Sequence, residues 1–328
     1  MNTFGNLIRL TTFGESHGPA MGGILDGMPS GVKIDLDKVQ AELDRRAPGR
    51  RPDTSQRREP DKVEFLSGFT ADGITLGTPI GFIIRNCDAR SRDYKEYNAR
   101  FRPNHADFTY FKKYGVHDFR GGGRASARET VSWVVAGALC RQLLELKGVE
   151  INASFIETNT VSQASAAGDS TGGIVECMIT GLPIGVGEPV ADKLHARLAG
   201  AMMSINAAKA FEYGDGFVSA SSFGSEQIDR FVSLDSPVCS SNHSGGIQGG
   251  ISNGMPVNFR VYFKPTPTIM RPVETIDAEG NSVVIPPKGR HDPCVAVRAV
   301  PVVEAMAAVT VAGLMRMSGF IPVNMGNA

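Results

Sequence analysis

The chain has 328 residues and a mass of 35.0 kDa, which is enough for one large hydrophobic core or two smaller ones. Lys and Arg together number 34, as do Asp and Glu, so the formal net charge is zero. This balance argues against a protein whose whole surface binds nucleic acid or an anionic membrane. Any basic site must therefore be local.

Cysteine usage favours a reduced compartment. The five cysteines lie far apart and form no C-x-x-C pair, so neither a disulfide framework nor a zinc cage is expected. No H-x-x-x-H pair suggests another metal, and we expect none. The first twenty residues lack the apolar core of a signal peptide, and the longest apolar stretch, 305–315, is too short to cross a membrane. We expect a cytoplasmic protein without membrane attachment.

Helical periodicity is clear in four segments. The first, 34–46, has Asp35 or Asp37 near its start, and the second, 125–147, has one apolar stripe and ends at Gly148. In the third, 188–204, the side chains of Val190, Leu194, Leu198 and Met202 are expected to face the core. The fourth helix is predicted over 302–317.

Strands are expected between these helices, over 22–25, 80–84, 173–180 and 257–263. The segments 161–173 and 223–241 are predicted to be surface loops. Helices and strands follow one another without a regular βαβ alternation, and no shift in composition marks a boundary. The sequence therefore predicts an α+β fold in which residues 1–328 form a single domain.

Arginine is concentrated at three places. Six arginines lie between Arg45 and Arg58 against one acid, Asp53. Arg120, Arg124 and Arg128 surround the glycines 121–123 at the start of the second helix, and Arg290 precedes His291 and Asp292. A glycine-rich turn at a helix N-terminus offers N–H donors to an anion, and guanidinium groups bind phosphate or carboxylate. The pattern favours a small polyanionic ligand, with Ser126 as N-cap, over a merely solvated loop.

Histidine is scarce, so its contexts are informative. His17, His105 and His291 lie in turns rich in Gly, Arg or Asp, which suits general acid–base work near neutral pH. His117 and His195 are interpreted as structural, and His243 is intermediate. Walker and Rossmann nucleotide motifs are absent. The residues alone thus indicate an enzyme acting on a small polyanion and do not name its reaction.

Three long motifs carry a family resemblance. They are 14–18 continuing to 25–29 (GESHG, LDGMP), 122–130 (GGRASARET), and 290–294 running to 304–306 (RHDPC, EAM). Shorter similar blocks occur in the same order at 56–61, 101–107, 203–207 and 241–247. In these motifs the chain resembles the chorismate synthases over nearly its whole length.

The resemblance implies the anti-1,4-elimination of phosphate from 5-enolpyruvylshikimate 3-phosphate, which gives chorismate in the shikimate pathway of aromatic amino-acid biosynthesis. It implies reduced FMN (FMNH2) as cofactor, an external flavin reductase as its source, and a homotetramer of β-α-β sandwich subunits. The substrate carries two carboxylates and a phosphate, which agrees with the abundance of arginine.

The resemblance also implies roles for single residues. His17 is expected to act as the acid that helps phosphate leave, His105 to protonate or steady the reduced flavin, and Asp292 to assist proton removal beside it. Arginines expected to bind substrate are Arg46, Arg51, Arg58 and Arg128. Residues expected to bind FMN are Arg124, Ala125, Ser126, Asn206, Ala207, Gly249, Lys264, Pro265, Thr266, Pro267, Thr268 and Arg290.

The chain departs from the family pattern at a few positions. Ala125 stands where a second serine is common, Pro52 near a usual arginine, and Pro267 and Thr268 where two serines are common; Arg51 is expected to replace the displaced arginine. Two other functions stay open from the residues. One is RNA binding by 45–58, against which the neutral charge and the lack of interleaved aromatic residues speak. The other is an NADPH-linked flavin reductase, for which NADP would be a second cofactor.

Overall fold

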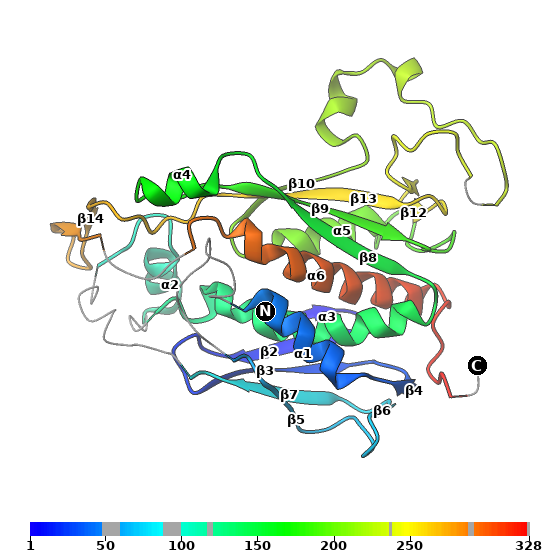
Figure 1. The fold of residues 1–328 in the computed structure, drawn as a ribbon, viewed down its shortest axis with the longest axis horizontal. Helices are drawn as coiled ribbons and strands as arrows, with labels where there is room; N and C mark the ends of the chain where they lie inside the picture. The colour runs from blue at the N-terminus through cyan, green and yellow to red at the C-terminus, as the bar shows by residue number, and fades with distance from the viewer. Residues whose placement is uncertain (48–59, 88–99, 117–120, 236–237, 288–291, 327–328) are drawn as a thin grey trace.

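Two antiparallel sheets enclose a layer of helices in this chain (Figure 1). The computed structural model describes residues 1–47, 60–87, 100–116, 121–235, 238–287 and 292–326. One hydrophobic cluster fills the space between the sheets and draws on residues of both. The α+β prediction is confirmed, with the three layers of a β-α-β sandwich.

The first sheet is built from the N-terminal part of the chain. Its strand order is β1-β2-β3-β7-β5, and each neighbouring pair is antiparallel. Its inner face is apolar because alternate residues point toward the helices, as Ile80, Phe82 and Ile84 do on one strand. The strands are β1 (Thr3–Gly5), β2 (Arg9–Gly14), β3 (Ala20–Asp26), β5 (Val63–Phe65) and β7 (Ile80–Arg85).

The second sheet comes from the C-terminal part, in the order β10-β13-β9-β8. The alternation predicted for 257–263 appears as Val257, Phe259, Val261 and Phe263 facing inward on its central strand. The strands are β8 (Glu150–Ile156), β9 (Gly173–Thr180), β10 (Ala208–Tyr213) and β13 (Val257–Phe263). Two-stranded pairs are β4 (Ser30–Lys33) with β6 (Ile74–Leu76), β11 (Ile247–Gln248) with β12 (Ile251–Ser252), and β14 (Val273–Ile276) with β15 (Ser282–Ile285).

The middle layer places α3 and α6 against each other, with α3 toward the first sheet and α6 toward the second (Figure 1). Gly137 makes this approach possible: a Cβ there would lie 2.2 Å from the Cβ of Ala305. The helices are α1 (Leu36–Arg46), α2 (Asp107–Tyr114), α3 (Thr130–Glu145), α4 (Val161–Ala166), α5 (Leu194–Met203) and α6 (Ala296–Met317).

Helix ends differ from prediction where local backbone decides them. Asp35 caps α1 as expected, accepting from the N–H groups of Asp37 and Lys38. The helix predicted from 188 begins only at Leu194, since Asp192 has a positive φ of 57°, and Val190 is 85% exposed rather than inward. α6 begins before Pro301, which it contains. Residues 161–173, predicted as a loop, include the short helix α4.

α6 is long and apolar enough to cross a membrane by length and composition alone. Its apolar window is 89% buried inside the protein. Such burial is typical of the central helix of a soluble protein, and the helix is fully accounted for by packing between α3 and the second sheet.

Candidate active site

His17 lies on the turn between β2 and β3, against the triple glycine. A Cβ at Gly121 would lie 2.1 Å from Nδ1 of His17, so only glycine leaves room for the imidazole. Nδ1 also lies 3.0 Å from Oγ of Ser16, which is fully buried. The first signature and the glycine turn therefore lie in direct contact.

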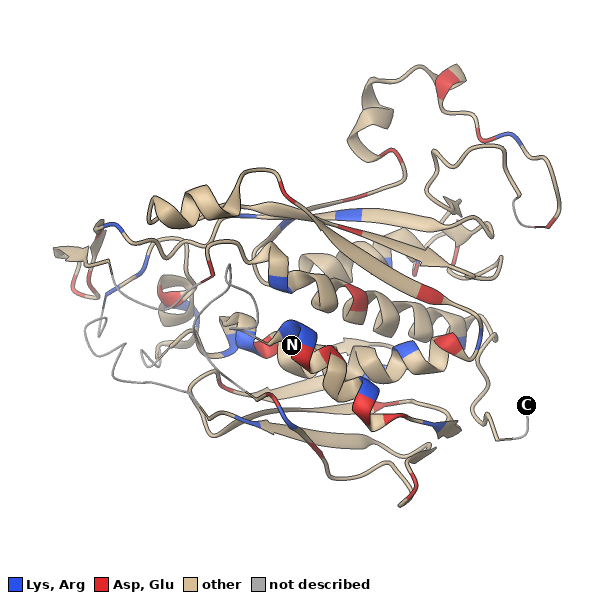
Figure 2. Cartoon of the chain, in the orientation of Figure 1, with Lys and Arg blue, Asp and Glu red and all other residues tan. Residues whose placement is uncertain are grey.

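A buried ion cluster lies where the end of α1 meets the start of α3 (Figure 2). Asp61 accepts from Nη1 of Arg46 at 3.0 Å and from Nη1 of Arg128, and all three side chains are at most 5% exposed. Arg46 also donates to Oγ1 of Thr130 and to the carbonyl of Ala127. Burial lowers the pKa of Arg46, while the nearby carboxylate opposes this.

Arg128 joins this cluster to the histidine turn. Its Nε donates to Oδ1 of Asn86 at 3.0 Å, and the amide of Asn86 donates to the carbonyls of Glu15 and Gly18 on either side of His17. Ser126 accepts from the N–H of Arg128, so it is a cap as predicted, but of a 3₁₀ turn rather than of α3. Two of the predicted ligand residues, Arg46 and Arg128, therefore lie in one site with His17.

The predicted cofactor segments meet on the other side of the start of α3. Asn206 donates to the carbonyl of Ala125 at 2.9 Å, and the N–H of Lys264 donates to the carbonyl of Ala207 at 3.0 Å. Lys264 Nζ donates to the carbonyl of Asn104. The segments 124–126, 206–207 and 264–268 thus lie together beside His105.

His105 is held by both ring nitrogens. Nδ1 lies 3.1 Å from the carbonyl of Pro103, and Nε2 lies 3.1 Å from Oγ1 of Thr268. A carbonyl only accepts, so Nδ1 carries the proton and Nε2 of the neutral ring accepts from the threonine. Burial, with the positive charge of Arg102, lowers the pKa of His105 to about 4. The imidazole is therefore neutral near pH 7.

We expect nuclear magnetic resonance of histidine-labelled protein to show this directly. The His105 signals should stay constant from pH 8 to pH 5 and shift only near pH 4. His243 is the internal control, because its hydrogen bond to Asp215 at 2.6 Å raises its pKa above the usual 6.5. Titration of His105 above pH 6 would contradict the burial argument.

Contacts of Asp292 and its neighbours reach both the arginine cluster and the predicted cofactor segments. It pairs with Arg298 at 2.7 Å, and Arg298 donates to the carbonyl of Arg46. The residue after it, Pro293, accepts from the N–H of Thr171, while Ser170 donates to the carbonyl of Thr266. Asp292 thus stands between the arginine cluster and the predicted cofactor segments.

Two of the predicted cofactor residues are placed differently. Arg124 donates to Glu129, Thr12, Gly14 and Asn2, so it fastens the start of α3 to the first sheet. Gly249 lies in the β11–β12 turn, which contacts 186–194 at the end of β13 opposite to Lys264 (Figure 1). Arg51, Arg58 and Arg290, with His291 and His117, lie outside the described residues.

Backbone strain gathers at this site. Among the described residues, the non-glycine positions with positive φ are Asp61, Asn104, Asp192 and Ala207. Asp61, Asn104 and Ala207 each take part in the hydrogen bonds described for this site. Such conformations cost about 1–3 kcal/mol each and persist where surrounding contacts enforce them.

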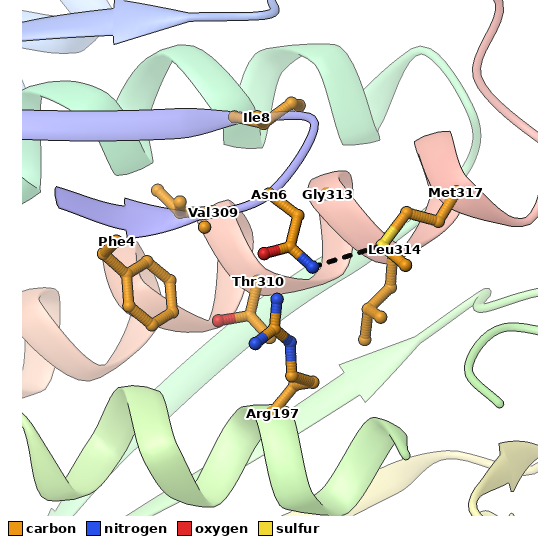
Figure 3. A pocket seen from close by; sticks show the side chains of 10 residues that line it. Phe4, Asn6, Ile8, Arg197, Val309, Thr310, Gly313, Leu314 and Met317 are labelled. Atoms are coloured by element: carbon orange, nitrogen blue, oxygen red, sulfur yellow. Dashed lines mark hydrogen bonds between the residues drawn. The ribbon is translucent and has the colours of Figure 1, made fainter. Parts of the chain in front are cut away.

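A wide surface cavity of about 670 Å³ lies beside α4 and is lined by Glu157, Gln163 and Asp169 among other described residues. A cavity of about 20 Å³ between the β1–β2 turn and α6 holds at most a water molecule (Figure 3). No three His, Cys, Asp or Glu side chains within the described ranges gather as metal ligands.

Sequence reasoning assigned no role to Asp61, Asn86 or Arg298. Each contacts a predicted residue in space and is far from it in the chain. The one available signal was the position of Asp61 at the end of the arginine-rich block 56–61.

Comparison with known proteins agrees with this arrangement. The family model described as chorismate synthase matches residues 8–164 and 156–315. Chorismate synthases of Phocaeicola vulgatus and Christiangramia forsetii are each 49% identical to this chain, covering 94% and 95% of it and 96% of their own lengths. A crystal structure of chorismate synthase superposes with a TM-score of 0.73 at 28% identity, over 95% of this chain and 92% of that one. The chain belongs to the chorismate synthase family of lyases.

Proposed function

We propose that the chain converts 5-enolpyruvylshikimate 3-phosphate into chorismate and inorganic phosphate with reduced FMN as cofactor. The observation that carries the proposal is one connected site in which His17, the arginine cluster, Asp292 and the segments beside His105 meet. A trianionic substrate needs buried guanidinium groups, and Arg128 has one to offer: its Nη2 is buried and has no partner.

The residues at the predicted cofactor segments fit a flavin phosphate and ring. Oδ1 of Asn206 and Oγ1 of Thr266 are both buried without a hydrogen-bond partner, as expected of groups that await a ligand. Lys264, with Nζ near this surface, and Ser126 would complete the contacts. When bound, reduced FMN supplies electron density that assists the loss of phosphate and is recovered at the end of the reaction.

The chain's own residues supply charge, protons and orientation. His17 would donate a proton to the departing phosphate, with Ser16 and Gly121 fixing the ring. Arg128 would bind an anionic group of the substrate through Nη2, and the buried charge of Arg46 would add to the attraction, which is strong where water is excluded. His105, neutral near pH 7 and hydrogen-bonded to Pro103 and Thr268, would steady the reduced cofactor by fixing the position of Thr268 rather than donate a proton. Asp292, oriented by Arg298, would assist removal of the C6 hydrogen.

An anaerobic assay tests the proposal. Purified protein, reduced FMN and 5-enolpyruvylshikimate 3-phosphate should release equal amounts of phosphate and chorismate. Absence of product over hours would refute the activity. Adding NADPH and oxidised FMN without a separate reductase distinguishes the alternative: we expect no NADPH oxidation, so an external reductase must supply the reduced flavin. We further propose a single catalytic domain, which the one hydrophobic cluster supports, and a cytoplasmic location, which membership of a family of biosynthetic enzymes supports.

Self-association into a homotetramer is supported by an apolar arm. The arm, residues 216–235, stands away from the two sheets and the helix layer (Figure 1), and its Phe217, Phe223, Phe231 and Leu234 are each at least 70% exposed. Three phenylalanines offer on the order of 500 Å² of contact area. Each partner of a stable interface buries about 800 Å². A second copy of this chain would bury these side chains.

We expect light scattering to give a mass of about 140 kDa, four times the chain's 35.0 kDa. Replacing Phe217, Phe231 and Leu234 with serine should shift the protein to smaller species, because the interface loses its apolar contacts. Leu146→Ser, at a 60% exposed position beyond α3, is the control and should leave the mass unchanged. An unchanged mass in the triple variant would rule out the arm as an interface.

A further inference from the structure

The carboxylate of Asp61 touches two arginines that are predicted to bind substrate. Both oxygens are in use: Oδ2 accepts from Arg46 and Oδ1 from Arg128. The side chain is 0% exposed. A carboxylate buried this deeply is costly unless its partners compensate it, so its retention needs a reason.

Among the described residues, the charges of the cluster do not balance. Arg46 and Arg128 bring two positive charges and Asp61 one negative charge, while the neighbouring Arg298 and Asp292 neutralise each other. The described residues therefore leave one positive charge in a buried place. An anionic ligand would restore the balance.

The free donor in the cluster lies on Arg128. All three nitrogens of Arg46 donate within the protein, to Thr130, Asp61 and Ala127. On Arg128, Nε donates to Asn86 and Nη1 to Asp61, and only Nη2 is left buried without a partner. Because the guanidinium is planar, these two contacts fix the direction of the Nη2 hydrogens.

Backbone conformation at Asp61 supports a positional role. Its φ is +45°, in the left-handed region that costs energy for residues other than glycine. Its carbonyl accepts from the amide of Gln40 on α1, which ties the strained residue to the helix that carries Arg46. The fold thus keeps Asp61 in a strained conformation that places its two oxygens between the two arginines.

We propose that Asp61 is a positioning residue: with Asn86 it clamps Arg128 so that Nη2 points at an anionic group of the substrate. This rests on the proposed function for the identity of the substrate. The carboxylate itself touches no substrate and acts only through the guanidinium of Arg128. Loss of the clamp should weaken substrate binding more than it slows the chemical step.

Steady-state kinetics of Asp61→Asn, Arg128→Gln and the double variant provide the test. We expect Asp61→Asn to raise KM for 5-enolpyruvylshikimate 3-phosphate about ten- to a hundred-fold, the range of one charged hydrogen bond, with a smaller fall in kcat. Since Asp61 acts through Arg128, the double variant should be no worse in KM than Arg128→Gln alone. Multiplied effects, or an unchanged KM in Asp61→Asn, would overturn the proposal. Asp26→Asn, which removes an exposed partner of Arg9, is the control.

A second readout is independent of turnover. Inorganic phosphate should raise the melting temperature of the wild type more than that of Asp61→Asn or Arg128→Gln. Equal shifts in all three would overturn the clamp even if the enzyme assay succeeds, whereas a wild type without lyase activity would refute only the proposed function. If Asp61→Asn does not fold, Asp61→Glu keeps the charge and displaces the clamp. It should then restore folding and still raise KM, and a wild-type KM would count against the proposal.

Discussion

Replacing His17 with alanine should lower kcat for chorismate formation by roughly 10²–10⁴-fold, the usual contribution of a positioned acid. The ring is fixed by Ser16 and by the space at Gly121, so its loss removes the proton donor without opening the core. The anaerobic assay measures the rate, and the melting temperature should stay close to that of the wild type.

Two further variants test whether the fall in kcat comes from the loss of a correctly placed imidazole. Gly121→Ala keeps the imidazole but adds a Cβ that would lie 2.1 Å from Nδ1, so the ring must move and activity should fall as well. His243→Ala, outside the site, should retain the full rate. A His17→Ala enzyme as active as the wild type would remove the acid from the mechanism.

Among substitutions that add a single methyl group to the core, we expect Gly137→Ala to lower the stability of the protein most. The new Cβ would lie 2.2 Å from Cβ and 2.3 Å from Cα of Ala305, so α3 and α6 must separate along their contact. Overpacking of this kind costs about 1–3 kcal/mol, and backbone contact places this case at the upper end. Urea unfolding followed by circular dichroism measures the loss.

A glycine in the facing helix provides a matched control. Gly313 in α6 has no atom within 4 Å of an added Cβ, and it lines the small cavity of Figure 3. Gly313→Ala should therefore be neutral or stabilise the protein by about 0.5–1 kcal/mol, the helix preference of alanine over glycine. Equal effects at the two positions would show that close helix contact is not the cause.

The sequence predicted the elements whose pattern is local and strong. The inward residues of β13, the Asp35 cap and the stripe of α3 all follow from periodicity. The start of α3 was placed too early because 123–129 form 3₁₀ turns around the site, and the helix at 188 was placed too early because Asp192 interrupts it. Such backbone details depend on distant contacts that periodicity does not contain.

In the site, too, some features could be predicted from the sequence and others could not. His17, His105, Arg46 and Arg128 stand out by residue type and surroundings, and the family motifs supplied their expected roles. The clamp of Asp61 and Asn86 on Arg128 could not be predicted, since it joins residues 42 and 67 positions apart through hydrogen bonds. The inward use of Arg124 was equally invisible, because a guanidinium can serve a ligand or the protein itself.

The pairing of α3 with α6 has a consequence during synthesis. Ala305 is 168 positions after Gly137 (305 − 137), so the ribosome makes the partner of α3 almost last. At about 5–20 residues per second, the nascent chain waits roughly 8–35 seconds with one side of α3 uncovered. During that interval the unfinished chain depends on chaperones or on its own solubility. The site that holds His17 cannot be complete before α6 has left the ribosome.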